Sequence, residues 1–92
     1  MASIPQASTL TEKPPRITSE QVRAARALLR WEQKDLAKAS GISLPSIKRL
    51  ETQPGALGGY DATVEAIREA FEREGVVFLM RGDGDGVGVQ MR

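Results

Sequence analysis

The stretch from Gln33 to Glu51 constrains the fold more than any other part of the chain. It contains two short segments in which apolar residues recur at helical spacing, separated only by Gly41-Ile42-Ser43. Glycine at position 41 permits the left-handed backbone that ends a helix abruptly. Ser43 can cap the next helix, and Pro45 suits its first turn, where a missing N–H costs nothing. The stretch therefore predicts two short helices joined by a tight turn.

The apolar residues of these two segments predict how the helices pack. Leu36, Ile47 and Leu50 would fill the wedge between the helices, and Ala37 is small where they cross closely. The second helix then protrudes from the surface of the domain. In this arrangement its N-terminal half can enter a DNA major groove, while the preceding helix lies over the backbone.

With this spacing, the chain resembles the Xre and lambdoid phage repressor (Cro-like) family of helix-turn-helix proteins over residues 17–71. The resemblance implies double-stranded DNA as the partner. It implies base contacts by Leu44, Pro45 and Arg49. It implies backbone or supporting contacts by Gln33, Ser43, Ser46 and Lys48. It also implies a structural ion pair between Arg26 and Glu51.

The sequence departs from the family pattern at two places. Leu44 and Pro45 stand where relatives often carry hydrogen-bonding side chains, so base readout would depend mainly on Arg49, which can pair with guanine. The family commonly continues with a fifth helix, whereas the end of this chain alternates like two strands around the turn Gly82-Asp-Gly-Asp-Gly86.

Two further helices are expected to flank the motif. Thr18 or Ser19 would cap the first, whose apolar stripe is Val22, Ala25, Leu28 and Leu29. Asp61 or Thr63 would begin the last, with Gly75 as its stop. Its apolar stripe consists of Val64, Ile67, Ala70 and Phe71.

The expected fold is mostly α: a compact four-helix, repressor-like helix-turn-helix domain with a short C-terminal β-hairpin and a disordered N-terminal arm. Residues 1–16 would form the arm, which contains Pro5, Pro14 and Pro15. The helical domain would span 17–75. Residues 76–92 would form a hairpin or tail that either packs on the domain or pairs with a second copy, as a dimerisation element.

The composition argues against an enzyme. The chain has no histidine and no cysteine, so the commonest general base, nucleophile and zinc ligands are missing. We expect no cofactor and no metal. Calcium at Asp83 and Asp85 is an alternative, but the further carboxylates of a calcium loop are lacking and a plain turn is favoured. The first residues lack a secretory pattern, so a cytoplasmic location is expected.

The charge is unevenly distributed. Residues 19–51 carry seven basic and four acidic side chains, whereas residues 61–75 carry two basic and five acidic ones. A polyanion would be attracted to the first segment and repelled by the second. Trp31 is expected in the core. Tyr60 would either contact a phosphate or anchor its loop.

Two functions are consistent with the sequence. The first is a sequence-specific DNA-binding transcriptional regulator, a repressor or autoregulator, acting as a homodimer. The second is a protein-binding helix-turn-helix module, such as an antiactivator or antitoxin, whose partner is another transcriptional regulator.

Overall fold

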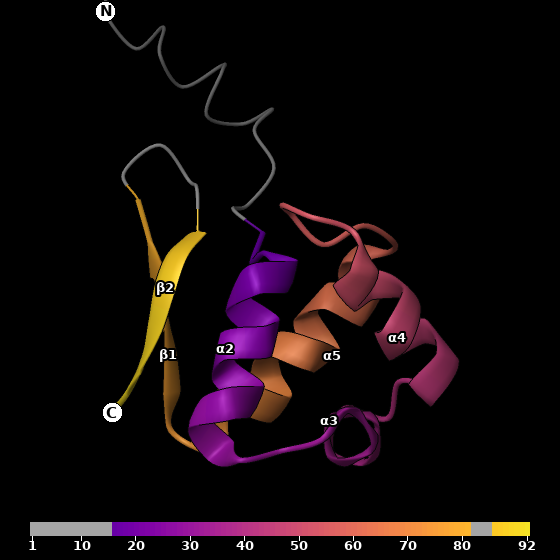
Figure 1. Ribbon diagram of the computed structural model, residues 1–92, viewed down its shortest axis with the longest axis horizontal. Helices are drawn as coiled ribbons and strands as arrows, with labels where there is room; N and C mark the ends of the chain where they lie inside the picture. Colours follow the sequence, from indigo (N-terminus) through magenta and orange to yellow (C-terminus); the bar gives the residue numbers. More distant parts are fainter. Residues whose placement is uncertain (1–15, 82–85) are drawn as a thin grey trace, which may run out of the picture.

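The computed structural model describes residues 16–81 and 86–92. Within them, four α-helices precede a two-stranded antiparallel sheet (Figure 1). The elements are α2 (Ser19–Leu29), α3 (Gln33–Ser40), α4 (Leu44–Thr52), α5 (Asp61–Glu72), β1 (Val76–Met80) and β2 (Gly86–Met91). The predicted fold class, a mostly helical domain with a C-terminal hairpin, is confirmed. Residues 1–15 of the predicted arm, and Asp83 and Asp85, lie outside the described residues.

The core forms around Phe71 of α5, which is fully buried. The ring of Trp31 stacks on it with the centroids 5.5 Å apart, and Phe78 of β1 meets it edge-on at 5.9 Å. Aromatic pairs in these geometries add stabilisation beyond their buried area. Trp31 therefore lies where the sequence places it, packed against the core.

α2 begins at a complete capping box. The hydroxyl of Thr18 accepts from the backbone N–H of Gln21, and the side chain of Gln21 accepts from the backbone N–H of Thr18. One prediction for this helix is wrong, because Leu28 is 45% exposed. Val22, Ala25 and Leu29 share one helix face, whereas position 28 is turned about 100° from position 29.

The helix-turn-helix is built as its residue types predict. α3 ends at Gly41, whose φ of 77° is left-handed. The hydroxyl of Ser43 accepts from the backbone N–H of Ser46 and caps α4. In Figure 1, α3 is seen end-on while α4 runs across the view, so the two helices cross steeply.

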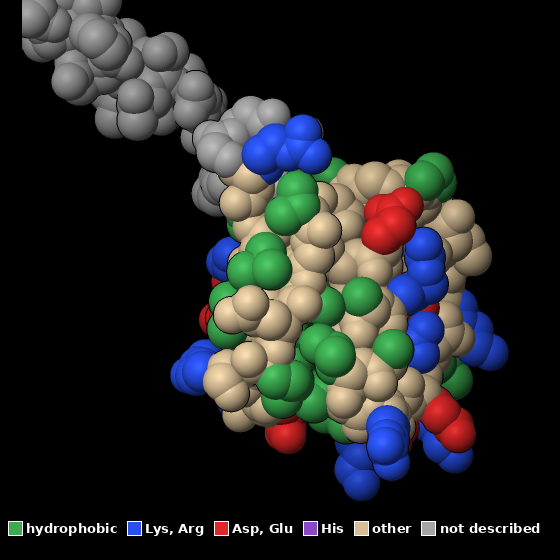
Figure 2. Space-filling view, turned by 60° about the vertical axis from the view of Figure 1, so that its left-hand side comes forward, with side chains coloured by type: hydrophobic (Ala, Val, Ile, Leu, Met, Phe, Trp, Pro, Cys, Tyr) green, Lys and Arg blue, Asp and Glu red, His purple; other side chains and the backbone are tan. Residues whose placement is uncertain are grey.

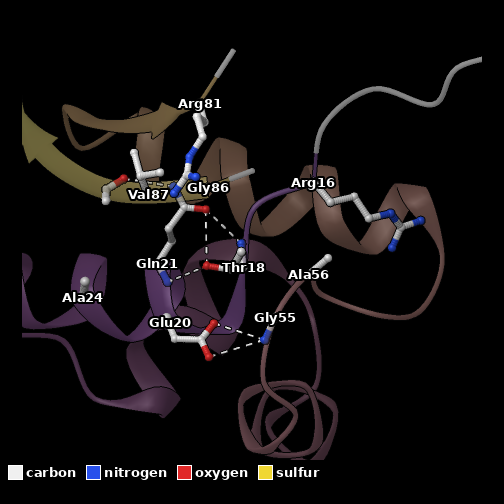
Figure 3. A pocket seen from close by; sticks show the side chains of 11 residues that line it. Arg16, Thr18, Glu20, Gln21, Ala24, Gly55, Ala56, Arg81, Gly86 and Val87 are labelled. Atoms are coloured by element: carbon white, nitrogen blue, oxygen red, sulfur yellow. Dashed lines mark hydrogen bonds between the residues drawn. The ribbon is translucent and has the colours of Figure 1, made fainter. Parts of the chain in front are cut away.

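The start of α2 is tied to the loop between α4 and α5. The backbone N–H of Ser19 donates to the carbonyl of Gly55, and that of Leu57 donates to the carbonyl of Ile17. The exposed carboxylate of Glu20 accepts from the N–H of Gly55 (Figure 3). Hydrogen bonds from its own backbone N–H and from Gly55 lower the pKa of Glu20, because they favour the charged form.

The hairpin packs across α2 through a buried side-chain amide. The Nε2 of Gln21 donates to the carbonyls of Leu79 on β1, at 3.1 Å, and of Gly88 on β2, at 2.9 Å. These two residues face each other in the ladder, just before a bulge at Met80. Gln21 thus caps α2 and holds both strands, and no atom of its buried amide lacks a partner.

The described helices are all short. None of those in 16–81 is long and apolar enough to cross a membrane.

Candidate nucleic-acid interface

α4 is anchored by one side and open on the other. Ile47, Leu50 and Glu51 are buried, while the residues between and before them remain accessible. The exposed residues are Ser43, Pro45, Lys48 and Arg49, and the half-exposed ones are Leu44 and Ser46. This pattern leaves the N-terminal half of α4 available to a partner.

A buried carboxylate fixes the orientation of α4. The guanidinium of Arg26 holds Glu51 with two charge-assisted bonds, from Nε to Oε2 at 2.8 Å and from NH2 to Oε1 at 2.7 Å. Such a bidentate fork sets direction as well as distance. Arg26 also donates to the carbonyl of Trp31 at 3.2 Å. These are the two residues for which the resemblance implies an ion pair.

Two further side chains complete this cluster. Gln33, at the start of α3, donates from Nε2 to Oε1 of Glu51 at 3.1 Å. Arg23 donates to the backbone carbonyl of Glu51 at 2.7 Å. Three helices therefore meet at one carboxylate, and the angle between α3 and α4 is set by polar contacts as well as by packing.

The pairing of Glu51 with Arg26 determines which charges remain exposed on α4. The only charged residues of α4 are Lys48, Arg49 and Glu51. Since Glu51 is buried against Arg26, the exposed surface of α4 carries cations alone. Neither Lys48 nor Arg49 has an ion-pair partner among the described residues.

A surface hollow of about 350 Å³ lies beside α4. It is bounded by the turn before α4, by Arg49, and by the first residues of α5. Its polar lining consists of hydroxyl groups and one cation, from Ser43, Ser46, Tyr60, Thr63 and Arg49, beside the apolar side chains of Ile42 and Leu50. Hydroxyls and guanidinium groups are the side chains that commonly contact nucleic-acid phosphates.

The structure excludes one of the two roles predicted for Tyr60. It is 83% exposed, so it does not anchor its loop by burial. Its neighbours Gly59 and Thr63 lie on the same hollow as Arg49. The ring is thus accessible from solvent beside α4.

No model of a known protein family matches this sequence. No curated protein matches it either. The function must therefore be argued from the geometry of these residues.

The structure brings most of the predicted site residues to one face. Leu44, Pro45, Ser46, Lys48 and Arg49 follow Ser43 on a single short helix. Gln33 differs, because its side-chain amide donates to Glu51 within the domain. Arg23 and Thr63 are not predicted as site residues from the sequence. Thr63 is expected there only as a possible start of the last helix, and the site residues that the two approach are distant along the chain.

Proposed function

We propose that this chain is a small sequence-specific DNA-binding transcriptional regulator, a repressor or autoregulator, that inserts α4 into the major groove. The observation that carries this proposal is the exposed surface of α4, whose only charged groups are the cations Lys48 and Arg49 and whose orientation is fixed by Arg26 and Glu51. A rigid recognition helix loses little conformational entropy when it binds.

The roles of individual residues follow from their side-chain chemistry. Arg49 would pair with O6 and N7 of guanine, and Leu44 would contact a thymine methyl group. Lys48 would neutralise a phosphate, with Ser46 and Tyr60 supplying hydroxyl contacts. Pro45 contributes shape alone, so sequence selectivity would depend mainly on Arg49.

The proposal is tested by selecting binding sites from a random pool of DNA duplexes, followed by titrations of the selected site. For Arg49→Ala we expect a loss of about 1–3 kcal/mol, together with relaxed preference at one base pair. For Lys48→Ala we expect weaker binding to all sequences and a salt slope smaller by about 0.9.

Arg81→Ala is the matched control. It removes the same charge directly after β1, and β1 lies on the opposite side of α2 from α4 (Figure 1). We expect it to change affinity much less than Arg49→Ala does. Failure to select any sequence, or equal losses in the two arginine variants, would overturn the proposal.

A second candidate is a module that binds another regulator protein, as an antiactivator or antitoxin does. It is favoured by the apolar pair Leu44 and Pro45 on the accessible half of α4, and by the exposed ring of Tyr60 at the hollow beside this helix. Aromatic residues are enriched at protein interfaces. Absence of DNA binding at low salt, with a stable complex that Tyr60→Ala disrupts, would favour this candidate.

A further inference from the structure

The side chain of Arg16 lies against the loop between α4 and α5. Its NH1 donates to the carbonyl of Leu57 at 2.8 Å and to that of Gly59 at 3.1 Å. Its NH2 pairs with the carboxylate of Asp61. The side chain is 22% exposed, and in Figure 3 it is directed away from Gln21. One guanidinium before α2 therefore holds three residues of the loop.

Few other contacts fix this part of the loop. Leu57 is buried and its N–H donates to the carbonyl of Ile17, but Tyr60 is 83% exposed. Tyr60 also occupies the N-cap of α5 without a side-chain cap bond. Among the described residues, no side chain other than that of Arg16 hydrogen-bonds to residues 57–60. The shape of the loop around Tyr60 therefore depends on Arg16.

The loop meets the proposed DNA surface along one side. Gly59 and Tyr60 line the hollow of about 350 Å³ that Ser46 and Arg49 line from α4. The hairpin side of the molecule differs, because Figure 2 shows hydrophobic side chains across its middle and charged ones mainly at its margins. Nucleic acids bind to cationic surfaces rather than to such a face. Tyr60 thus lies beside the surface that we propose for DNA.

We propose that Arg16 is a positioning residue for DNA binding. It holds the loop from Leu57 to Asp61 in the shape that presents Tyr60 to a phosphate, and it does not itself contact DNA. This role rests on the proposed function, in which the hydroxyl of Tyr60 contacts the nucleic-acid backbone. A preordered loop loses less conformational entropy on binding than a mobile one does. Without Arg16 this entropy would be lost at binding, and the affinity would fall.

The geometry favours this role over a direct contact between Arg16 and a phosphate. The guanidinium could reach a phosphate only by giving up its bonds to Leu57, Gly59 and Asp61. Two backbone carbonyls would then lose a donor. A planar guanidinium also suits several acceptors at fixed positions, which the single ammonium group of a lysine does not match.

Arg16 also neutralises a carboxylate. The side chain of Asp61 is 79% exposed, so without its partner it would repel an approaching phosphate. Arg16→Ala therefore changes both the shape of the loop and its charge. The double variant Arg16→Ala with Asp61→Asn separates the two effects, because it removes one charge of each sign while the loop still loses its hydrogen bonds.

The first measurement needs no DNA. Nitrogen-15 relaxation of the full chain gives order parameters for the backbone amides of residues 58–60. In the wild type we expect values of about 0.85, falling toward about 0.6 in Arg16→Ala. Arg68→Ala is the matched control, because it removes an arginine that pairs with Glu65 within α5 and does not hydrogen-bond to the loop. It should leave the loop as rigid as in the wild type.

The second measurement is a titration of the selected DNA duplex. The charge-balanced double variant should bind about three- to tenfold more weakly than the wild type, as should Tyr60→Ala. When all three substitutions are combined, the further loss should be less than about twofold, because Arg16 acts through Tyr60. A merely structural role would instead weaken binding equally in both backgrounds. Circular dichroism establishes that each variant is folded.

The possible failures are distinguishable. Order parameters that stay unchanged in Arg16→Ala would overturn the positioning role alone. Wild-type affinity in the charge-balanced variant would do the same, since it would assign the effect to charge. Independent losses from Arg16 and Tyr60 would likewise overturn it. A wild type that selects no DNA would overturn the proposed function, and this role with it.

Discussion

At the scale of single residues, Glu51 shows how a buried charge can serve recognition. It is 6% exposed and accepts from Arg26 and Gln33, while its backbone carbonyl accepts from Arg23. A buried ion pair adds little net stability compared with a well-packed apolar pair. Its contribution here is directional: it sets the angle of α4 and keeps a negative charge away from the exposed helix surface.

The cost of breaking this pair gives a residue-scale prediction. Glu51→Gln leaves the guanidinium of Arg26 partly buried without its counter-charge, so we expect a loss of about 3 kcal/mol in the free energy of unfolding. Glu65→Gln is the control, because its pair with Arg68 is exposed on α5 and contributes at most about 1 kcal/mol. Urea unfolding of both variants measures the difference. Equal midpoints would show that Glu51 is not a structural anchor.

At the scale of elements, the hairpin depends on Gln21 and therefore on Gly86. A Cβ added at Gly86 would overlap Oε1 and Cδ of Gln21, whose amide is held by both strands and cannot move freely. At Gly88 an added Cβ would meet only Cδ1 of Leu79, at 4.0 Å. Two glycines on one strand thus differ in whether the structure can accommodate a side chain at their position.

We expect Gly86→Ala to destabilise the domain by about 1–3 kcal/mol, as forced overpacking does. Gly88→Ala should change stability by less than about 1 kcal/mol. Thermal unfolding followed by circular dichroism compares the two. If Gly88→Ala proves the more damaging, Gln21 does not dock the hairpin as described.

The sequence predicts local features of the elements better than the packing between them. The turn between α3 and α4 is predictable because Gly41 and Ser43 act on their immediate neighbours. The docking of the hairpin is not, because Gln21 lies 58 and 67 residues from the carbonyls that it binds. The exposure of Leu28 was missed because helical spacing does not reveal which elements cover a helix face.

At the scale of the whole molecule, the proposed DNA surface and the hairpin lie on opposite sides of α2. α4 occupies one side and the hairpin the other (Figure 1). Substitutions in the hairpin that leave the domain folded should therefore leave DNA binding through α4 unaltered, since distant sites are usually independent.

The proposed function also makes a prediction about the operator. As a homodimer, the chain should select two inverted half-sites separated by about one helical turn, centre to centre. Sequencing the pool of selected duplexes measures the spacing. A pool that contains only single sites would show that one copy binds DNA alone.

The contact between Gln21 and Gly88 also affects biosynthesis. The same side chain that completes the capping box of α2 also donates to a carbonyl that is synthesised 67 residues later. During translation, α2 emerges before the strand that packs on it, so the side that β2 covers is still open. The nascent chain therefore cannot assume its final packing until Gly88 has left the ribosome, and until then it exposes a surface that chaperones can bind.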